Sequence, residues 1–256
     1  ENIVPLITVA GTVFAYFSII ILSYGDFSRY VKNTKELKKG NMSLILNLLL
    51  FSFFAVFIVV GCDVILNQSL ENMERILTNP TDIIGKFDNI IITTLVLFFI
   101  IFASASTNLI ANYVPTQNVL LNFSPSKLNL KIVAIIISIL GFVVGIFWLT
   151  LLSQVGILSF IDTFGSIFGP LFGIMVVDYY SIKKGNLVNK DIFSSAVDSS
   201  YYYSSGWHLK AVYSLLIGFI FAAGTIWNEN LMHLHSYSWL IGAFVSSLTY
   251  YLLASR

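Results

Sequence analysis

The sequence predicts an all-α, multi-pass membrane protein with seven transmembrane helices. Only 11% of its 256 residues are charged and 57% are hydrophobic, whereas a soluble domain carries about 25% charged residues. Apolar runs of about 20 residues, the length that a helix needs to cross a bilayer, recur along the chain. Seven such runs occur, at residues 4–24, 42–66, 89–113, 130–152, 155–182, 210–227 and 236–254.

The positions of the basic residues predict the orientation of these helices. All fourteen Lys and Arg residues lie in the segments between the runs or at their ends. Twelve occupy one set of alternate segments, and only Arg75 and Lys86 occupy the other. Because Lys and Arg accumulate in cytoplasmic loops, the sequence predicts that the N-terminal end lies outside the cell and the C-terminus in the cytoplasm.

The sequence lacks the residues that several classes of protein require for their function. Cys62 is the single cysteine, so neither an intrachain disulfide nor a thiolate metal cluster is expected. His233 and His235 would face opposite sides of a helix without a third ligand nearby, which argues against a metal site. No nucleophile-elbow, phosphate-loop or metalloprotease motif occurs, so we do not expect an enzyme. The basic residues flank the apolar runs instead of forming one patch, so we do not expect a nucleic-acid-binding protein.

The first run ends in a polar motif at residues 25–30, Gly-Asp-Phe-Ser-Arg-Tyr. Asp26 and Arg29 are three residues apart, so their side chains can pair on a helix. The basic residue can also neutralise the exposed carbonyls at a helix C-terminus. Ordinary capping at the membrane interface would use the same residues.

The second run is nearly featureless. Asp63 lies at its outer end, where a solvated helix end tolerates charge. The loop that follows, residues 67–89, is long for a connection between helices. From this length we expect residues 67–89 to form a short helix or a lid over the outer face.

The third run changes character near its inner end, where small and hydrogen-bonding residues replace apolar ones. Ala103, Ser106 and Thr107 lie at i, i+3 and i+4 on one helical face. Asn108 and Asn112 form a second i, i+4 pair. Hydroxyl and carbonyl oxygens suit a hard cation such as sodium, and a carboxamide can donate to and accept from a heterocyclic amide. Close helix packing, with Asn and Ser joining neighbouring helices, explains the same stretch at least equally well.

Proline and glycine residues shape the later runs. Pro115 predicts that the third helix ends or kinks just beyond Asn112. Gly141 and Gly145, in the fourth run, have the spacing of a helix-packing motif. Three glycines and Pro170 interrupt the fifth run and predict a bend, which suits either a moving gate or a static kink filled by its neighbours. The last two runs predict plain helical packing.

Four motifs, in this order, make the chain resemble the nucleobase:cation symporter family, whose members carry cytosine, uracil, purines, allantoin and hydantoins. The motifs are residues 25–30, residues 106–112 (Ser-Thr-Asn-Leu-Ile-Ala-Asn), residues 168–173 (Phe-Gly-Pro-Leu-Phe-Gly) with 178–180 (Asp-Tyr-Tyr), and residues 201–208 (Tyr-Tyr-Tyr-Ser-Ser-Gly-Trp-His). Each motif alone is a weak signal, and together they are specific. The resemblance covers nearly the whole chain.

This resemblance implies a leucine-transporter-type fold, in which two inverted five-helix repeats alternate access around a site at the bilayer midplane. The chain would then begin at the sixth helix and would form a single transmembrane domain over residues 1–256. Residues 1–182 would be the second repeat and residues 183–256 the two terminal helices. The first repeat would be absent from the chain, and we expect a fragment or a processed chain. A sixth helix that starts outside agrees with the orientation predicted from the basic residues.

The resemblance also implies a cation site in the third run. Sodium would bind the carbonyl oxygen of Ala103 and the hydroxyls of Ser106 and Thr107. The sequence leaves a proton open as the alternative coupling ion, and it implies no organic cofactor.

For the substrate, the resemblance implies a site that combines an aromatic ring with carboxamides. Phe17, nine residues before the acid of the first motif, would stack on the substrate ring, with Tyr16 beside it. Many relatives have Trp at the position of Phe17, so the substrate preference stays open. Asn112 would contact the substrate, and Asn108 would support it from one turn earlier.

The implied function is that of a cation-coupled symporter importing a nucleobase or related cyclic ureide, such as cytosine, uracil, allantoin or hydantoin, across the plasma (inner) membrane. Its partners would be the substrate, the lipid bilayer and the missing N-terminal half. A sodium symporter of the same fold for another small substrate, such as an amino acid, is the first alternative. That carrier would need groups for a carboxylate and an ammonium. A membrane scaffold that transports nothing is the second alternative.

Overall fold

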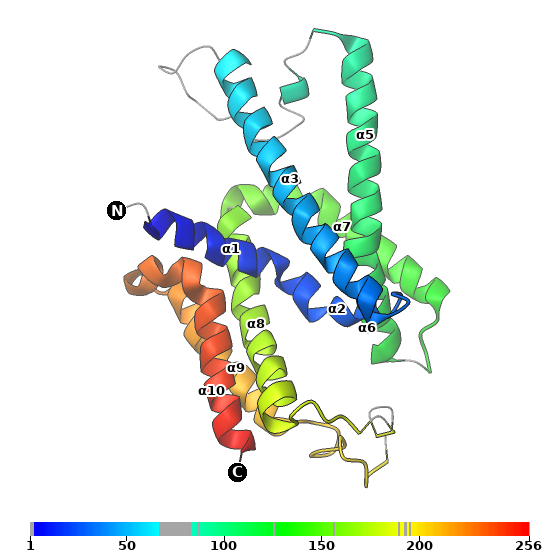
Figure 1. Cartoon of the computed structure of the whole chain (residues 1–256), viewed down its shortest axis with the longest axis vertical. Helices are drawn as coiled ribbons and strands as arrows, with labels where there is room; N and C mark the ends of the chain where they lie inside the picture. Colours follow the sequence, from blue (N-terminus) through cyan, green and yellow to red (C-terminus); the bar gives the residue numbers. More distant parts are fainter. Residues whose placement is uncertain are drawn as a thin grey trace. The chain divides into compact units, whose positions relative to one another are not determined.

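The chain folds into helices joined by loops, of which a long one connects η2 (Asp178–Ile182) to α9 (Leu209–Trp227) (Figure 1). The computed structural model describes residues 3–66, 83–85, 88–124, 126–155, 157–188, 190–191, 194 and 196–255. Within these ranges, β structure is limited to one isolated bridge between Ser204 and Trp207. The predicted all-α class is confirmed.

The helices follow the predicted apolar runs, with short helical turns between some of them. In chain order they are α1 (Ile3–Leu22), α2 (Tyr24–Ser28), α3 (Thr34–Leu66), α5 (Ile90–Asn108), η1 (Leu109–Tyr113), α6 (Val114–Phe123), α7 (Leu130–Val155), α8 (Ile157–Val177), η2 (Asp178–Ile182), α9 (Leu209–Trp227), η3 (Glu229–Tyr237) and α10 (Ser238–Ala254).

Six segments among the described residues are long and apolar enough to cross a membrane, which makes the chain a multi-pass membrane protein. They are Thr34–Cys62, Ile90–Phe123, Leu130–Trp148, Phe160–Ile182, Leu209–Trp227 and His233–Ala254. The first predicted run folds as α1, whose apolar part, Val9–Leu22, is shorter than these six segments. Six of the seven predicted spans are therefore confirmed.

Asparagine side chains fix the starts of three long helices. The Asn89 side chain accepts hydrogen bonds from the backbone N–H groups of Ile91 and Ile92 at the start of α5. Asn33 does the same at the start of α3, and Asn129 at the start of α7. Each satisfies a backbone donor that the first helical turn leaves without a partner. The cap at Asn33 lets α3 begin eight residues before the predicted apolar run. The Asp63 side chain and most of the predicted lid, residues 67–89, lie outside the described residues.

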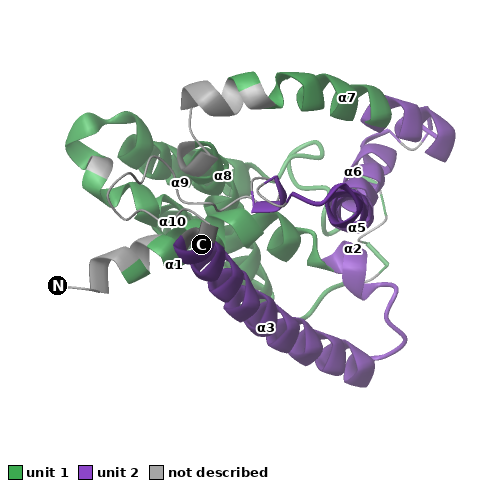
Figure 2. Cartoon of the chain, turned by 90° about the horizontal axis from the view of Figure 1, so that it is seen from above, with its two compact units in different colours: residues 1–24, 138–256 green, residues 25–137 purple. Residues whose placement is uncertain are grey.

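The chain divides into two compact units (Figure 2). Unit 1 comprises Glu1–Tyr24 and Ser138–Arg256, and unit 2 comprises Gly25–Ile137. The predicted boundary at residue 182, between a repeat and two terminal helices, stays a prediction.

The core of unit 1 forms where α8 packs against α1, α9 and α10. Glycines make this packing close. A Cβ atom at Gly165 would lie 2.6 Å from the Cβ of Ala15 on α1. A Cβ at Gly169 would run into the backbone carbonyl of Trp239 on α10. In this structure, neighbouring helices therefore fill the space beside the α8 glycines, as a static packing role requires.

The fourth predicted run behaves differently. A Cβ atom at Gly141 or Gly145 on α7 would meet no described atom within 4 Å. The expected helix packing at this motif is therefore absent from the described part of the chain. The spacing of two glycines permits a close approach between helices, but it does not supply the second helix.

The third predicted run does not end at Pro115. After Asn108 the helix widens into the π-helical turn η1, and it continues as α6 to Phe123. The backbone N–H of Val114 donates to the carbonyl of Leu109, five residues earlier. Pro115 lies in the first turn of α6, directly after η1. The helix therefore does not end just beyond Asn112, and its hydrogen-bond pattern changes there instead.

Candidate functional site

The predicted cation ligands lie near the end of α5, in unit 2. The hydroxyl of Ser106 donates a hydrogen bond to the carbonyl oxygen of Ala103, at 3.0 Å. Two of the three predicted ligand oxygens are therefore neighbours. A hydroxyl that donates its proton keeps its lone pairs for a cation. The side chain of Thr107 is exposed one residue further along. Neutral hard oxygens of this kind fit a sodium ion.

A ladder of hydrogen bonds runs along another face of the same helix. The Asn108 amide donates to the carbonyl oxygen of Ser104, and the Asn112 amide donates to the side-chain oxygen of Asn108. Thr116 then donates to the carbonyl of Asn112. The predicted pairing of Asn108 with Asn112 is confirmed. Their own helix orients both carboxamides, which limits their rotamers before any ligand binds.

This polar stretch is exposed. Ser104, Ser106, Thr107, Asn108 and Asn112 are all exposed side chains on a helix that is otherwise apolar. A packing role would bury them against a neighbouring helix. Within the described part of the chain, no helix covers them.

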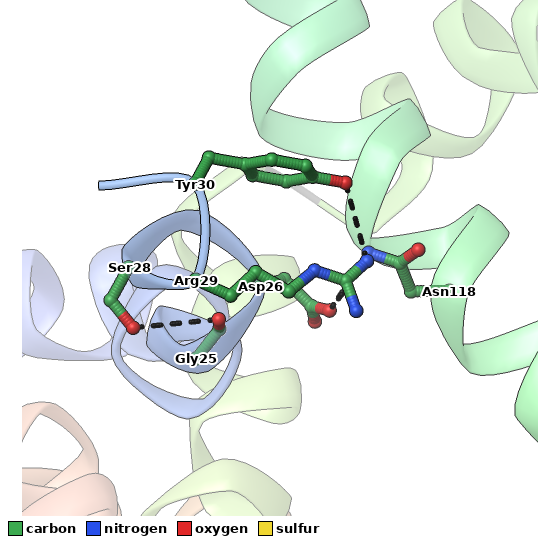
Figure 3. Close-up of polar contacts among 6 residues, drawn as sticks. All are labelled: Gly25, Asp26, Ser28, Arg29, Tyr30 and Asn118. Carbon is green, nitrogen blue, oxygen red and sulfur yellow. Dashed lines mark hydrogen bonds and ion pairs between the residues drawn. The ribbon is translucent and has the colours of Figure 1, made fainter. Parts of the chain in front are cut away.

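The first sequence motif is held by a residue of α6, also in unit 2. The Asn118 amide donates a hydrogen bond to the carboxylate of Asp26 at 2.8 Å (Figure 3). Arg29 Nη2 lies 4.0 Å from the same carboxylate oxygen, Asp26 Oδ1, so the predicted pairing of Asp26 with Arg29 is confirmed at the long end of an ion pair. Asn118 is 7% exposed. A nearly buried hydrogen bond to a charged group contributes about 1.5–3 kcal/mol, more than the half-exposed Arg29 pair.

Unit 1 contains an aromatic cavity of about 340 Å³ between α1, α7 and α8. Its size falls in the lower part of the range for small-molecule sites. Five aromatic side chains line it, Tyr16, Trp148, Phe160, Phe164 and Phe168. Trp148 meets Phe160 edge to face, with the ring centroids 5.2 Å apart. Flat faces and ring edges of this kind suit a planar apolar or heterocyclic group.

A family model describes the relatives of the chain. Residues 2–242 match the model of permeases for cytosine and purines, uracil, thiamine and allantoin. The chain belongs to this permease family. It is 29% identical to a purine-uracil permease from Arabidopsis thaliana over 206 residues, which are 80% of the chain and 33% of that relative. It is 25% identical to an allantoin permease from Bacillus subtilis over 254 residues, which are 99% of the chain and 50% of that relative.

The chain thus spans between a third and a half of the length of these permeases. No solved structure gave a significant match. The resemblance identified from the four motifs is confirmed, and it assigns the chain to a family of transporters rather than of enzymes.

The structure places the predicted substrate residues in both units. Tyr16 lines the aromatic cavity of unit 1, whereas Phe17 meets the edge of Tyr16, with the ring centroids 5.2 Å apart. Asn108 and Asn112 lie in unit 2. That these four residues meet around one substrate stays a prediction.

Sequence reasoning missed three kinds of residue in this chain. Asn118 gave no signal, because its partner Asp26 lies 92 residues away in the chain. Phe160, Phe164 and Phe168 recur every four residues, but such a stripe is also usual on a lipid-facing helix. Trp148 lies within an apolar run, where nothing sets it apart.

Two of the family motifs meet at the end of unit 1 formed by η2 and the start of α9. The Asp178 carboxylate accepts hydrogen bonds from Lys183 and Tyr250, each at 2.6 Å. The imidazole of His208 stacks on the Tyr203 ring, with the centroids 3.9 Å apart. The motif at 178–180 and the motif at 201–208 therefore form one cluster.

Burial and the neighbouring Asp178 shift the pKa values of two groups in this cluster. The pKa of the His208 imidazole lies below its ordinary value, chiefly because burial disfavours the charged form. Burial alone would also lower the pKa of Lys183. The hydrogen bond and charge of Asp178 outweigh that effect and raise the Lys183 pKa above its ordinary value. At neutral pH the cluster holds a charged lysine beside an uncharged histidine.

Proposed function

We propose that the chain forms the second half of a cation-coupled secondary transporter that imports a nucleobase or related cyclic ureide. Membership of the permease family supports the substrate class. The relatives named above are permeases for purines and uracil and for allantoin. All of these are flat rings that carry amide groups, so one site chemistry can serve them.

The observation that carries the proposal is the exposed polar stretch of α5 and η1. Five hydrogen-bonding side chains stand exposed on an apolar helix whose other surface suits lipid. Their own helix satisfies part of their hydrogen-bonding capacity. The remaining oxygens and amides can serve a ligand that enters from water. Polar groups in the bilayer persist where they line such a path.

In the proposed transporter, the chain supplies helices six to twelve of a leucine-transporter-type fold. Residues 1–182 form the inverted second repeat, with α1 as the sixth helix of the whole transporter, and residues 183–256 form two terminal helices. Its N-terminal end lies outside the plasma membrane and its C-terminus in the cytoplasm. The distribution of Lys and Arg supports this orientation.

In the proposed transporter the substrate ring stacks on aromatic side chains, and carboxamides donate to and accept from its edge. Phe17 and Tyr16 supply ring faces, and the aromatic cavity of about 340 Å³ beside Tyr16 supports this assignment. Asn112, oriented by Asn108, donates to and accepts from the ring amides.

Sodium is the proposed coupling ion, bound by the oxygens of Ala103, Ser106 and Thr107. The close approach of Ser106 to Ala103 supports this ligand set. If sodium and substrate both favour the outward-facing state, each raises the affinity of the other by the same factor.

Uptake of radiolabelled uracil and allantoin by the full-length transporter, measured against sodium concentration, tests this function. Thr107→Val keeps the shape of the side chain but removes one hard oxygen, so we expect its sodium curve to shift to higher concentration. Ser104→Ala changes a hydroxyl outside the proposed ligand set and should leave the curve in place.

Two outcomes would contradict the proposal. If uptake depends on sodium concentration in the same way in both variants, the polar stretch of α5 and η1 would serve helix packing instead. In that case a lost hydrogen bond costs about 0.6 kcal/mol of stability and does not depend on sodium. Uptake of an amino acid with no uptake of a nucleobase would favour a carrier of the same fold for another substrate. Amounts of folded protein are matched throughout.

A further inference from the structure

A buried carboxylate lies within the membrane-spanning part of unit 1. Asp162 belongs to α8, inside the apolar segment Phe160–Ile182. The residue is 3% exposed. An ionised carboxylate removed from water is strongly destabilised unless a partner compensates its charge. An ionisable residue in a membrane helix therefore needs a named partner or a functional explanation.

The partner of Asp162 is His235 of η3. The imidazole Nε2 lies 3.2 Å from the Asp162 carboxylate oxygen Oδ2. The side chain of His235 is 20% exposed as a whole, although its Nε2 atom is buried. One side of the imidazole thus meets the buried carboxylate, while another part of the ring remains accessible. A ring placed in this way can carry a proton between solvent and the carboxylate.

The pair lies where α1, α8 and η3 interlock. A Cβ atom at Gly11 of α1 would run into the backbone carbonyl of Ser236 on η3. Gly165, one turn after Asp162 on α8, meets Ala15 of α1. Substitution at either glycine would require backbone or Cβ displacement. Asp162 therefore lies at a junction that packs directly against α1, which carries Tyr16 at the aromatic cavity.

A second buried polar group marks the same junction. The indole Nε1 of Trp239 is buried and has no hydrogen-bond partner. Nε2 of His235 is also buried, and its 3.2 Å contact with Asp162 does not have the geometry of a hydrogen bond. Trp239 faces Gly165 and Gly169 on α8. Together with Asp162, these glycines follow the spacing i, i+3 and i+7, so both groups meet one face of α8.

The remaining titratable groups around the pair are few. Within the described part of unit 1, His235 is the ionisable group that lies against Asp162. The other titratable groups of α1 and η3 are Tyr16, Glu229, His233 and Tyr237. Those of α9 and α10, such as Lys210 and Tyr250, lie at the opposite ends of their helices, away from η3. One carboxylate and one imidazole therefore control the local charge.

We propose that Asp162 and His235 form a proton-binding pair, and that the transporter moves one proton through this pair with each substrate. When the pair holds the proton, its net charge is zero and the contact between α8 and η3 is closed. When the proton leaves, a carboxylate without a counter-charge remains, which favours hydration and opening of the contact. The proton belongs to the pair rather than to either residue.

This inference rests on the proposed transport function and adds a proton site to it. The test uses the full-length transporter in liposomes that contain a pH-sensitive dye, with uracil and allantoin as substrates. Wild-type protein should acidify the lumen when substrate enters. Asp162→Asn should lose acidification and accumulation against a gradient, while exchange of labelled for unlabelled substrate stays within about twofold, because exchange needs no net proton movement.

Two further variants sharpen the test. His235→Gln should also abolish acidification, because an amide cannot carry the proton. Glu229→Gln changes an exposed acid on the same element and should behave as wild type. Substrate uptake by wild type without acidification would overturn the proposal. Full acidification by Asp162→Asn or His235→Gln would also overturn it.

A measurement without substrate separates this proposal from the proposed function. Purified full-length protein is titrated with acid from about pH 8 to 5, the range in which histidine changes charge. His235→Gln should bind about one proton fewer than Glu229→Gln, since this substitution removes the imidazole of the pair and one exchangeable proton is assigned to the pair. Absence of nucleobase uptake by every variant would defeat the proposed function. Equal proton binding by these two variants would defeat the proton site.

Discussion

Two neighbouring aromatic residues on α1 are both proposed to contact the substrate ring. Tyr16 lines the cavity of unit 1, and Phe17 packs edge to face against it. The side chain of Ser18, next in the chain, is buried and donates a hydrogen bond to the carbonyl of Phe14. This buried neighbour fixes the face of α1 on which both rings stand.

Phe17→Ala in the full-length transporter should weaken substrate binding about fivefold relative to Phe17→Trp. An aromatic face contributes about 1 kcal/mol beyond its buried area, and Trp retains that face. Binding of uracil and allantoin to both purified variants measures the difference. Equal affinities would remove Phe17 from the site, and a loss confined to Tyr16→Ala would assign ring binding to the cavity residue.

The hydrogen bond from Asn118 to Asp26 could not be predicted from the sequence. The helical spacing of Asp26 and Arg29 predicted their pairing, because both lie in one turn. Asn118 is too distant in sequence for any periodic pattern to link it to Asp26. Only the path of the chain through η1 and α6 brings the two side chains together.

At the scale of whole elements, α8 and α7 show what glycine spacing can and cannot predict. Both helices carry glycines four residues apart. Those of α8 meet Ala15 and Trp239, whereas those of α7 face open space among the described residues. The difference lies in the neighbouring helices, which the local sequence of α7 or α8 does not encode.

Gly169→Ala should lower the apparent melting temperature of the full-length protein in detergent, because the added Cβ runs into the Trp239 carbonyl. Overpacking of this kind costs about 1–3 kcal/mol. Gly141→Ala is the matched control on α7, and it should be neutral or slightly stabilising because Ala is the better helix former. Similar losses for both variants would show that the control position is also packed.

The cluster that joins η2 to the start of α9 should make stability depend on pH. The lowered His208 pKa means that the unfolded state binds more protons than the folded state at acidic pH. Stability should therefore be full above about pH 6.5, the ordinary value for histidine, and should fall as the pH drops below it. Apparent melting temperatures between pH 8 and 5 measure this slope.

His208→Phe keeps a ring to stack on Tyr203 but cannot be protonated. The slope below about pH 6.5 should therefore be shallower in this variant, since histidine is the group that titrates there. An unchanged slope would assign the acid sensitivity to another group.

At the scale of the whole molecule, composition located the helices but not their packing. Apolar runs are local properties, so the approximate positions of the long helices followed from them. The hydrophobic runs are alike on all sides, and they could not distinguish the buried face of α8 from the exposed faces of α3 and α5. The aromatic cavity arises from α1, α7 and α8 together, and no single run contains it.

Residues 1–256 alone should not transport. The mostly exposed apolar segments of α3, α5 and α7 need lipid or further protein to cover them. The polar stretch of α5 would face lipid in the absence of the first repeat. Reconstituted residues 1–256 should therefore show no saturable, sodium-dependent uptake of uracil or allantoin. Such uptake would refute the division of the proposed transporter into two necessary halves.

The π-helical turn between α5 and α6 has a consequence for mapping this region by chemical labelling. A π turn holds about one residue more than an α turn, so the side chains beyond it are rotated by about 100° from the course of α5. Cysteine accessibility along residues 90–123 should therefore show a 3.6-residue rhythm that breaks its phase within Leu109–Tyr113. A single helical wheel drawn through the whole segment would assign Asn118 to the wrong side.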